Sequence, residues 1–104
     1  MTQEFYIWIE QQDANYKAGN TDIRPYYDHT FNDLPWDMQW GVYQKFFWET
    51  KGWWLSTYPY TDKFGGKIRG FWGEAHLTRD YITNVPEQAQ RSLVEDAFKR
   101  IEKD

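Results

Sequence analysis

The stretch LPWDMQWGVYQKFFWETKG, from Leu34 to Gly52, decides the fold because it carries the clearest helical pattern in the sequence. Large apolar residues recur at the three- and four-residue spacing of one helix face, at Trp36, Trp40, Tyr43 and Phe47. Pro35 suits a first helical turn, and Gly52 is typical of the position just past a helix end. The stretch therefore predicts a helix over about residues 35–50.

The chain that follows this helix is typical of a β-hairpin. Residues 53–60 are rich in aromatic strand formers, and residues 61–66 contain the Asp and Gly of a turn. Residues 67–77 are predicted to form the return strand, with Gly70 and Gly73 at a bulge or a close backbone approach.

A second helix is predicted over about residues 86–103. Asn84 and Glu87 have the three-residue spacing of a capping box, and Pro86 suits the first turn. A narrow stripe on one helix face then runs through a charged sequence, formed by Gln90 and the apolar residues Leu93, Val94, Ala97 and Ile101.

Before the central helix, the continuous apolar run Phe5–Ile9 predicts a strand covered on both faces. Residues 12–33 show no sustained period, so they predict a long irregular connection with a short strand near residues 23–27. A connection of this length is usually functional, mobile or a missed element.

The predicted elements give an α+β fold, in which a small antiparallel sheet of about three to four strands packs against the helices at about 35–50 and 86–103. A chain of 104 residues is expected to form a single globular domain over residues 1–104.

The composition is dominated by aromatic residues. There are 7 Trp, 8 Tyr and 7 Phe, against only 13 Val, Ile and Leu. The net charge of −4 argues against a general duplex-DNA binder. The sequence has no apolar run long enough to span a membrane, no leader-like N-terminus and no cysteine. It therefore predicts a cytoplasmic protein with no membrane partner.

With so few aliphatic residues, half or more of the aromatic side chains are needed in the core. The surplus is concentrated between residues 36 and 72, where helix 35–50 is apolar around much of its circumference. We expect this surplus to form a ligand- or partner-binding surface, together with two nearby bases: Trp36, Trp40, Trp48, Trp53, Trp54, Tyr58, Tyr60, Lys67, Arg69, Phe71 and Trp72.

The hairpin around Lys67, Arg69, Phe71 and Trp72 interleaves bases with aromatic residues. That pattern suits stacking and phosphate contacts with a nucleotide or a single-stranded nucleic acid, with Tyr58 and Tyr60 opposite. The competing interpretation is a solvated sheet edge, on which basic side chains prevent pairing with other strands.

Catalytic and metal-binding patterns are weak. The serines lack the glycine setting of a nucleophile, and no cysteine is present. A metal site would need Glu74 and His76, which lie on one face of the predicted strand, together with Asp28 and His29 as further ligands. No spacing in the sequence brings these four residues together. We therefore predict no enzyme activity, no catalytic residue, no metal site and no cofactor.

The segment Leu34–Phe47 resembles a pattern in small uncharacterised proteins of phages and prophages, in which an LPxxxQWGVYxxFF-like helix precedes a hairpin and a charged C-terminal helix. The resemblance covers about 70 residues. It implies a mobile-element context, with the host cytoplasm as location, and a role by binding, such as blocking a host protein or sequestering a ligand.

The leading hypothesis from the sequence is thus a non-enzymatic accessory or inhibitor protein that acts through an aromatic-rich protein–protein interface. Its partner is another protein or a second copy of the chain. The alternatives are a binder of nucleotides or single-stranded nucleic acid on the 53–77 hairpin, and a carbohydrate-binding module that uses exposed tryptophans.

Overall fold

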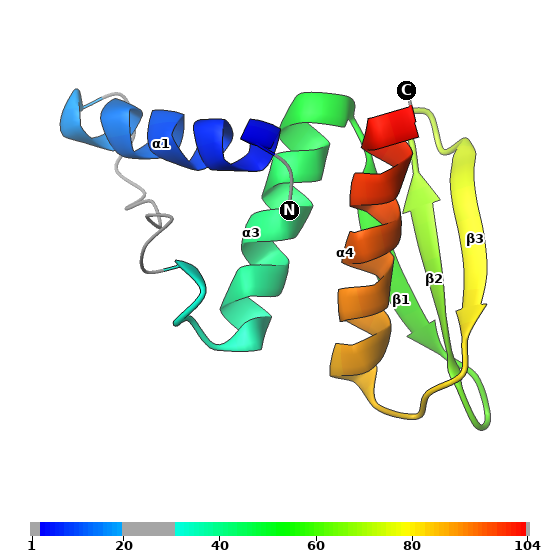
Figure 1. Ribbon diagram of the computed structural model, residues 1–104. Helices are drawn as coiled ribbons and strands as arrows, with labels where there is room; N and C mark the ends of the chain where they lie inside the picture. The colour runs from blue at the N-terminus through cyan, green and yellow to red at the C-terminus, as the bar shows by residue number, and fades with distance from the viewer. Residues whose placement is uncertain (1–2, 20–30, 104) are drawn as a thin grey trace. The chain divides into compact units, whose positions relative to one another are not determined.

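The computed structural model describes residues 3–19 and 31–103, which contain helices and one antiparallel sheet (Figure 1). The predicted α+β class is confirmed. In chain order the elements are α1 (Gln3–Lys17), α3 (Trp36–Lys51), β1 (Trp54–Pro59), β2 (Phe64–Arg69), β3 (Ala75–Tyr81) and α4 (Pro86–Lys103). The chain divides into two compact units, Met1–Gln39 and Trp40–Asp104, and each is described by itself.

In the first unit, the run Phe5–Ile9 lies inside helix α1, so the predicted strand is wrong. Phe5, Trp8 and Ile9 are buried at helical spacing, whereas Ile7 is about half exposed. The Phe5 ring packs edge-on against Phe31 at a centroid distance of 5.3 Å. A short apolar run fits a strand or a helix equally well, and here the packing of one face decided for the helix.

The irregular connection predicted for residues 12–33 is also partly wrong, because α1 continues to Lys17. The short strand predicted near residues 23–27 lies outside the described residues. Where the chain is described again, Gln39 stabilises the turn that leads into α3. Its buried side-chain amide donates to the carbonyl oxygen of Leu34 at 2.8 Å.

In the second unit, the rest of α3 and the whole of α4 pack through aromatic side chains. Phe98 of α4 contacts the rings of Tyr43, Phe46 and Phe47 at centroid distances of 5.8, 5.9 and 4.9 Å. Both predicted helices are therefore confirmed. Just before α4, the Thr83 hydroxyl accepts a hydrogen bond from the N–H of Val85 at 3.1 Å, which closes a local turn ahead of the helix.

The sheet has the order β1-β2-β3, with both neighbouring pairs antiparallel. The predicted turn at 61–66 is too long, because β2 already begins at Phe64 and includes Gly65 and Gly66. The predicted return strand at 67–77 is in fact the end of β2, a turn at residues 70–74 and the start of β3. Gly65 and Gly66 fit inside the strand because neighbouring side chains occupy the space above each of them.

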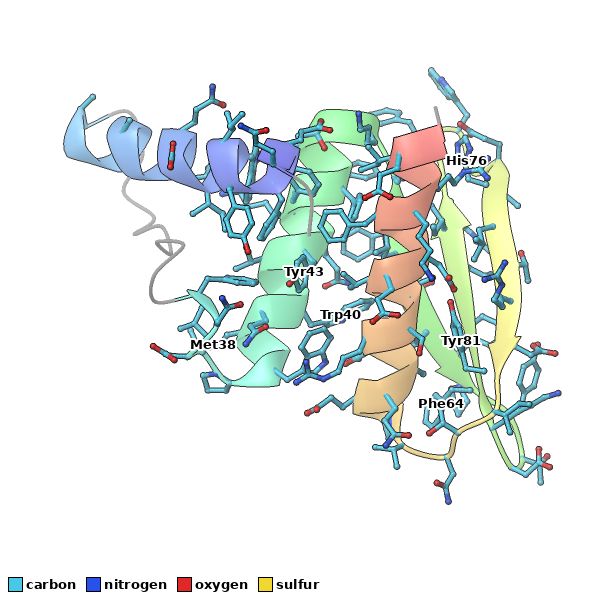
Figure 2. The ribbon with its side chains drawn as sticks, in the orientation of Figure 1. Met38, Trp40, Tyr43, Phe64, His76 and Tyr81 are labelled. Carbon is cyan, nitrogen blue, oxygen red and sulfur yellow. The ribbon has the colours of Figure 1, made fainter. Side chains whose placement is uncertain are left out.

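Helix α4 lies over one face of the sheet (Figure 1). This inner face carries Leu55 and Ile68, which are paired across β1 and β2 and fully buried. Tyr81 of β3 lies beside α4 in Figure 2, and its hydroxyl donates to the Asp96 carboxylate at 2.7 Å. Because side chains alternate along a strand, the residues between these positions form the opposite, outer face.

Candidate binding surface

The outer face of the sheet is defined by the strand register. It consists of Trp54, Ser56, Tyr58, Gly65, Lys67, Arg69, Thr78 and Asp80. The two central glycines fix the assignment, since a Cβ on Gly65 would meet the Tyr58 ring, whereas a Cβ on Gly66 would meet Tyr81 and Leu93 of the inner side. The outer face therefore places the aromatic side chains of β1 beside the basic side chains of β2, with Thr78 and Asp80 of β3 at its other edge.

One end of the outer face continues into a cluster of exposed aromatic side chains. We call Trp48, Trp54, Phe71 and Trp72 the exposed aromatic cluster. Trp48 meets Trp54 edge-on at 6.2 Å and stacks on Phe71 at 5.2 Å with the ring planes 14° apart. Phe71 in turn meets Trp72 at 5.8 Å. The relative exposures are 39, 46, 66 and 89% for Trp48, Trp54, Phe71 and Trp72.

The turn at residues 70–74 that carries Phe71 and Trp72 is held by Glu74. The Gly70 N–H donates to the Glu74 carbonyl at 2.8 Å, and the Trp72 N–H donates to the Glu74 carboxylate at 2.9 Å. Gly73 has a φ of 82°, which a side chain would strain, and Gly70 has no room for a Cβ beside Glu74. The turn is thus closed by backbone and carboxylate together.

Hydrogen bonds also lower the pKa of Glu74. Its own backbone N–H is the largest cause, and the Trp72 N–H and the nearby His76 act in the same direction. His76 Nε2 lies 3.5 Å from the Glu74 carboxylate, so protonated His76 forms an ion pair with it. The carboxylate form that holds the turn is therefore favoured at neutral pH.

The other end of the outer face carries tyrosines with lysines over their rings. Tyr58 and Tyr60 meet at 5.3 Å. Lys67 Nζ lies 5.0 Å from the centre of the Tyr58 ring, and Lys63 Nζ lies 5.4 Å from that of Tyr60. A hydrogen bond with Tyr60, followed by burial, raises the pKa of Tyr58. Lys63 also pairs with Asp80 at 3.3 Å.

The structure brings most of the predicted site residues together within the second unit. Trp48, Trp54, Phe71 and Trp72 share one cluster, and Arg69 is the cross-strand partner of Trp54. Tyr58, Tyr60 and Lys67 lie together farther along the same face. Trp54 and Lys67 therefore belong to one continuous surface.

The remaining predicted site residues lie elsewhere. Trp53 is only 7% exposed and stacks on Phe47 in the core, with the Arg100 guanidinium 5.9 Å from its ring, so it does not belong to the surface. Trp40 is half-buried on α3. Trp36 is half-buried too and falls in the first unit.

Sequence reasoning missed two residues that shape this surface. Glu74 holds the turn, and the signal for it was a carboxylate directly after the Phe71–Gly73 segment. Gly65 gives the Tyr58 ring its place against the sheet, but in the sequence the Gly65–Gly66 pair indicated a turn. The role of Gly65 depends on cross-strand register, which the local sequence does not specify.

The described part of the chain contains no group of three or more His, Asp and Glu side chains that could hold a metal ion. Asp28 and His29, the further ligands considered from the sequence, lie outside it.

In residues 3–19 and 31–103, no helix is long and apolar enough to cross a membrane. The partly buried Tyr81–Asp96 pair, with Arg79 bound to Asp96 at 3.0 Å, joins β3 to α4.

Comparison with known proteins returned no match to a protein-family model, to a curated protein or to a solved structure.

Proposed function

We propose that this protein is a non-enzymatic binding protein whose exposed aromatic cluster docks a protein partner. The observation that carries the proposal is the unbroken series of ring contacts from Trp48 through Phe71 to Trp72, along which exposure rises to 89%. Contiguous apolar patches of this kind are typical of interaction sites, and Trp is enriched among the residues that dominate binding.

The energetics of the cluster support this role. With the exposures of Phe71 and Trp72, and about 200 Å² for each side chain, roughly 300 Å² of ring surface faces water. Burying that area would contribute about 7 kcal/mol before the costs of association. Because Glu74 already holds the turn, little ordering of Phe71 and Trp72 is needed when a partner binds.

The surroundings of the cluster define the chemistry of the partner. Arg69 stands beside Trp54 and forms no ion pair within the described part of the chain. A complementary partner therefore offers an apolar groove for Phe71 and Trp72 and a carboxylate for Arg69. The resemblance of residues 34–47 to small phage proteins supports the same kind of role, as an accessory or inhibitor protein in a host cell.

The test replaces Trp72 with a photo-crosslinking amino acid and illuminates the protein in an extract of the cells that encode it. The cross-linked protein is identified, purified and titrated against the wild-type chain by calorimetry. Phe71→Ser and Trp72→Ser should each weaken binding by about tenfold or more. Ile82→Ser is the matched control, because Ile82 is fully exposed after β3 and outside the cluster.

Three results would contradict the proposal. They are no specific cross-link at position 72, binding that survives both substitutions in the cluster, and binding that Ile82→Ser weakens equally. A cross-link between two copies of the chain would point to a homodimer, and sedimentation of the wild type and of Trp72→Ser would then decide whether the cluster forms the dimer contact.

A further inference from the structure

We propose that the outer face of the sheet is a second binding site, for a single-stranded nucleic acid. The site comprises Trp54 and its cross-strand partner Arg69 at one end, Lys67 in the middle, and Tyr58 and Tyr60 at the other end. It shares Trp54 and Arg69 with the protein-docking surface, but it extends along the sheet to Lys67, Tyr58 and Tyr60 and does not depend on the turn that carries Phe71 and Trp72.

The register sets aromatic and cationic side chains in an alternating arrangement. Trp54 is paired with Arg69, Ser56 with Lys67, and Tyr58 with Gly65. Trp54 and Tyr58 are four residues apart on one strand, so they stand about 13 Å from each other. Single-strand binding surfaces combine stacking platforms and backbone-tracking cations in this way.

The charge of this face is suited to phosphate. Lys67 and Arg69 form no ion pair within the described residues, whereas the carboxylate of the face, Asp80, is already paired with Lys63 at 3.3 Å. By contrast, Arg79 and Arg91 are engaged with Asp96 and Glu87 at 3.0 Å. Lys67 and Arg69, which have no carboxylate partner in the described residues, therefore lie on the same face as Trp54 and Tyr58.

The shape of the outer face favours a single-stranded nucleic acid over a duplex. Small side chains, Ser56 and Thr78, flank Lys67 across the three strands. The Tyr58 ring lies against Gly65, where no side chain displaces it. Such a shallow surface offers ring faces to unstacked bases, which a duplex keeps stacked inside its helix.

The experiment measures the fluorescence anisotropy of labelled 12-nucleotide oligo(dT) and oligo(U), with a labelled duplex of the same length for comparison. The wild type should bind at least one single-stranded probe at low salt, and bind the duplex at least tenfold more weakly. Lys67→Ala/Arg69→Ala should reduce the slope of log affinity against log salt by about 1.4, the value for two phosphate contacts to a single strand.

Stacking is tested separately with Tyr60→Ala, which should weaken binding roughly 5- to 100-fold. The control is Lys99→Ala, which removes an exposed cation from α4, the helix on the other side of the sheet, and should leave binding unchanged. Thermal unfolding of each variant ensures that only folded proteins are compared.

The proposal is overturned if the wild type binds no single-stranded probe, if the duplex binds as well as the single strands, or if Lys99→Ala weakens binding as much as Lys67→Ala/Arg69→Ala. Phe71→Ser/Trp72→Ser separates the two proposals: it should abolish partner binding and leave oligonucleotide binding within about twofold, since the outer face is untouched. Loss of oligonucleotide binding in that variant would assign the nucleic acid to the exposed aromatic cluster and overturn the second site.

Discussion

Gly66→Ala tests the packing of β2 against α4. A Cβ at this position would lie 2.7 Å from Cε2 of Tyr81 and 3.1 Å from a methyl group of Leu93. Neither neighbour has room to move: the Tyr81 hydroxyl is bound to Asp96 at 2.7 Å, and Leu93 is fully buried. The substitution must therefore displace either the helix or the strand.

Two opposing effects determine how much Gly66→Ala lowers the free energy of unfolding. Overpacking a tight core costs about 1–3 kcal/mol. Replacing Gly by Ala reduces the entropy of the unfolded chain, which offsets about 0.4–1 kcal/mol. The net loss for Gly66→Ala should be about 1–2 kcal/mol, which for a chain of this length lowers Tm by about 5–15 °C.

Urea denaturation followed by circular dichroism measures the free energy of unfolding. Two other glycines serve as references. Gly65→Ala should cost less than Gly66→Ala, because the Tyr58 ring that it meets lies on the outer face and can move aside. Gly41→Ala should stabilise by about 0.5–1 kcal/mol, since nothing lies near its position in α3. A Gly66→Ala protein as stable as the wild type, or a larger loss for Gly65→Ala, would refute the packing described.

Three further predictions concern the core and two ionisable groups. Phe98→Ala should cost about 3–5 kcal/mol in urea denaturation, because Phe98 contacts three rings of α3. Burial, and then the Asp96 carboxylate, raise the pKa of Tyr81, so its contribution to stability is complete below about pH 10 and is lost as the pH rises further. Tyr81→Phe should flatten this alkaline loss in unfolding measured from pH 8 to 11. Hydrogen bonds, chiefly from its own backbone N–H, lower the pKa of Glu74, so the carboxylate that holds the turn persists at neutral pH and is lost only in acid, below the ordinary pKa of a Glu side chain. At pH 3, hydrogen exchange of the Trp72 N–H should be faster, relative to that of the N–H groups of β2, than it is at pH 6. In Glu74→Gln this ratio of exchange rates should be the same at pH 3 and pH 6.

The two long helices were predictable because their signals are local. Residues 86–103 carry a repeating apolar stripe, and α4 has those bounds. Helix α3 differs from the predicted 35–50 by one residue at each end. In both, one face had enough periodic apolar residues to indicate the burial that the structure shows.

The wrong predictions arose where tertiary contacts override local preference. Phe5–Ile9 has the composition of a strand, but burial of Phe5, Trp8 and Ile9 selects a helix. Gly65 and Gly66 have the composition of a turn, but they lie inside β2 because Tyr58, Tyr81 and Leu93 fill the space beside them.

The candidate binding surface was predictable as a set of residues, but not as an arrangement. The aromatic surplus between residues 36 and 72 does contain the exposed aromatic cluster. The sequence did not separate Trp53, which is buried, from its neighbour Trp54, which is exposed, because alternation along β1 depends on where the strand begins.

The order β1-β2-β3 followed by α4 has a consequence for synthesis of the chain on the ribosome. The three strands emerge first and can pair through two short hairpins, each of which forms in about 1–10 μs. The apolar side chains of Leu55 and Ile68 then have no cover until α4 has been made. A chain truncated before residue 86 would therefore leave this apolar face uncovered and should bind chaperones that recognise apolar surface, whereas the full chain covers the face with α4.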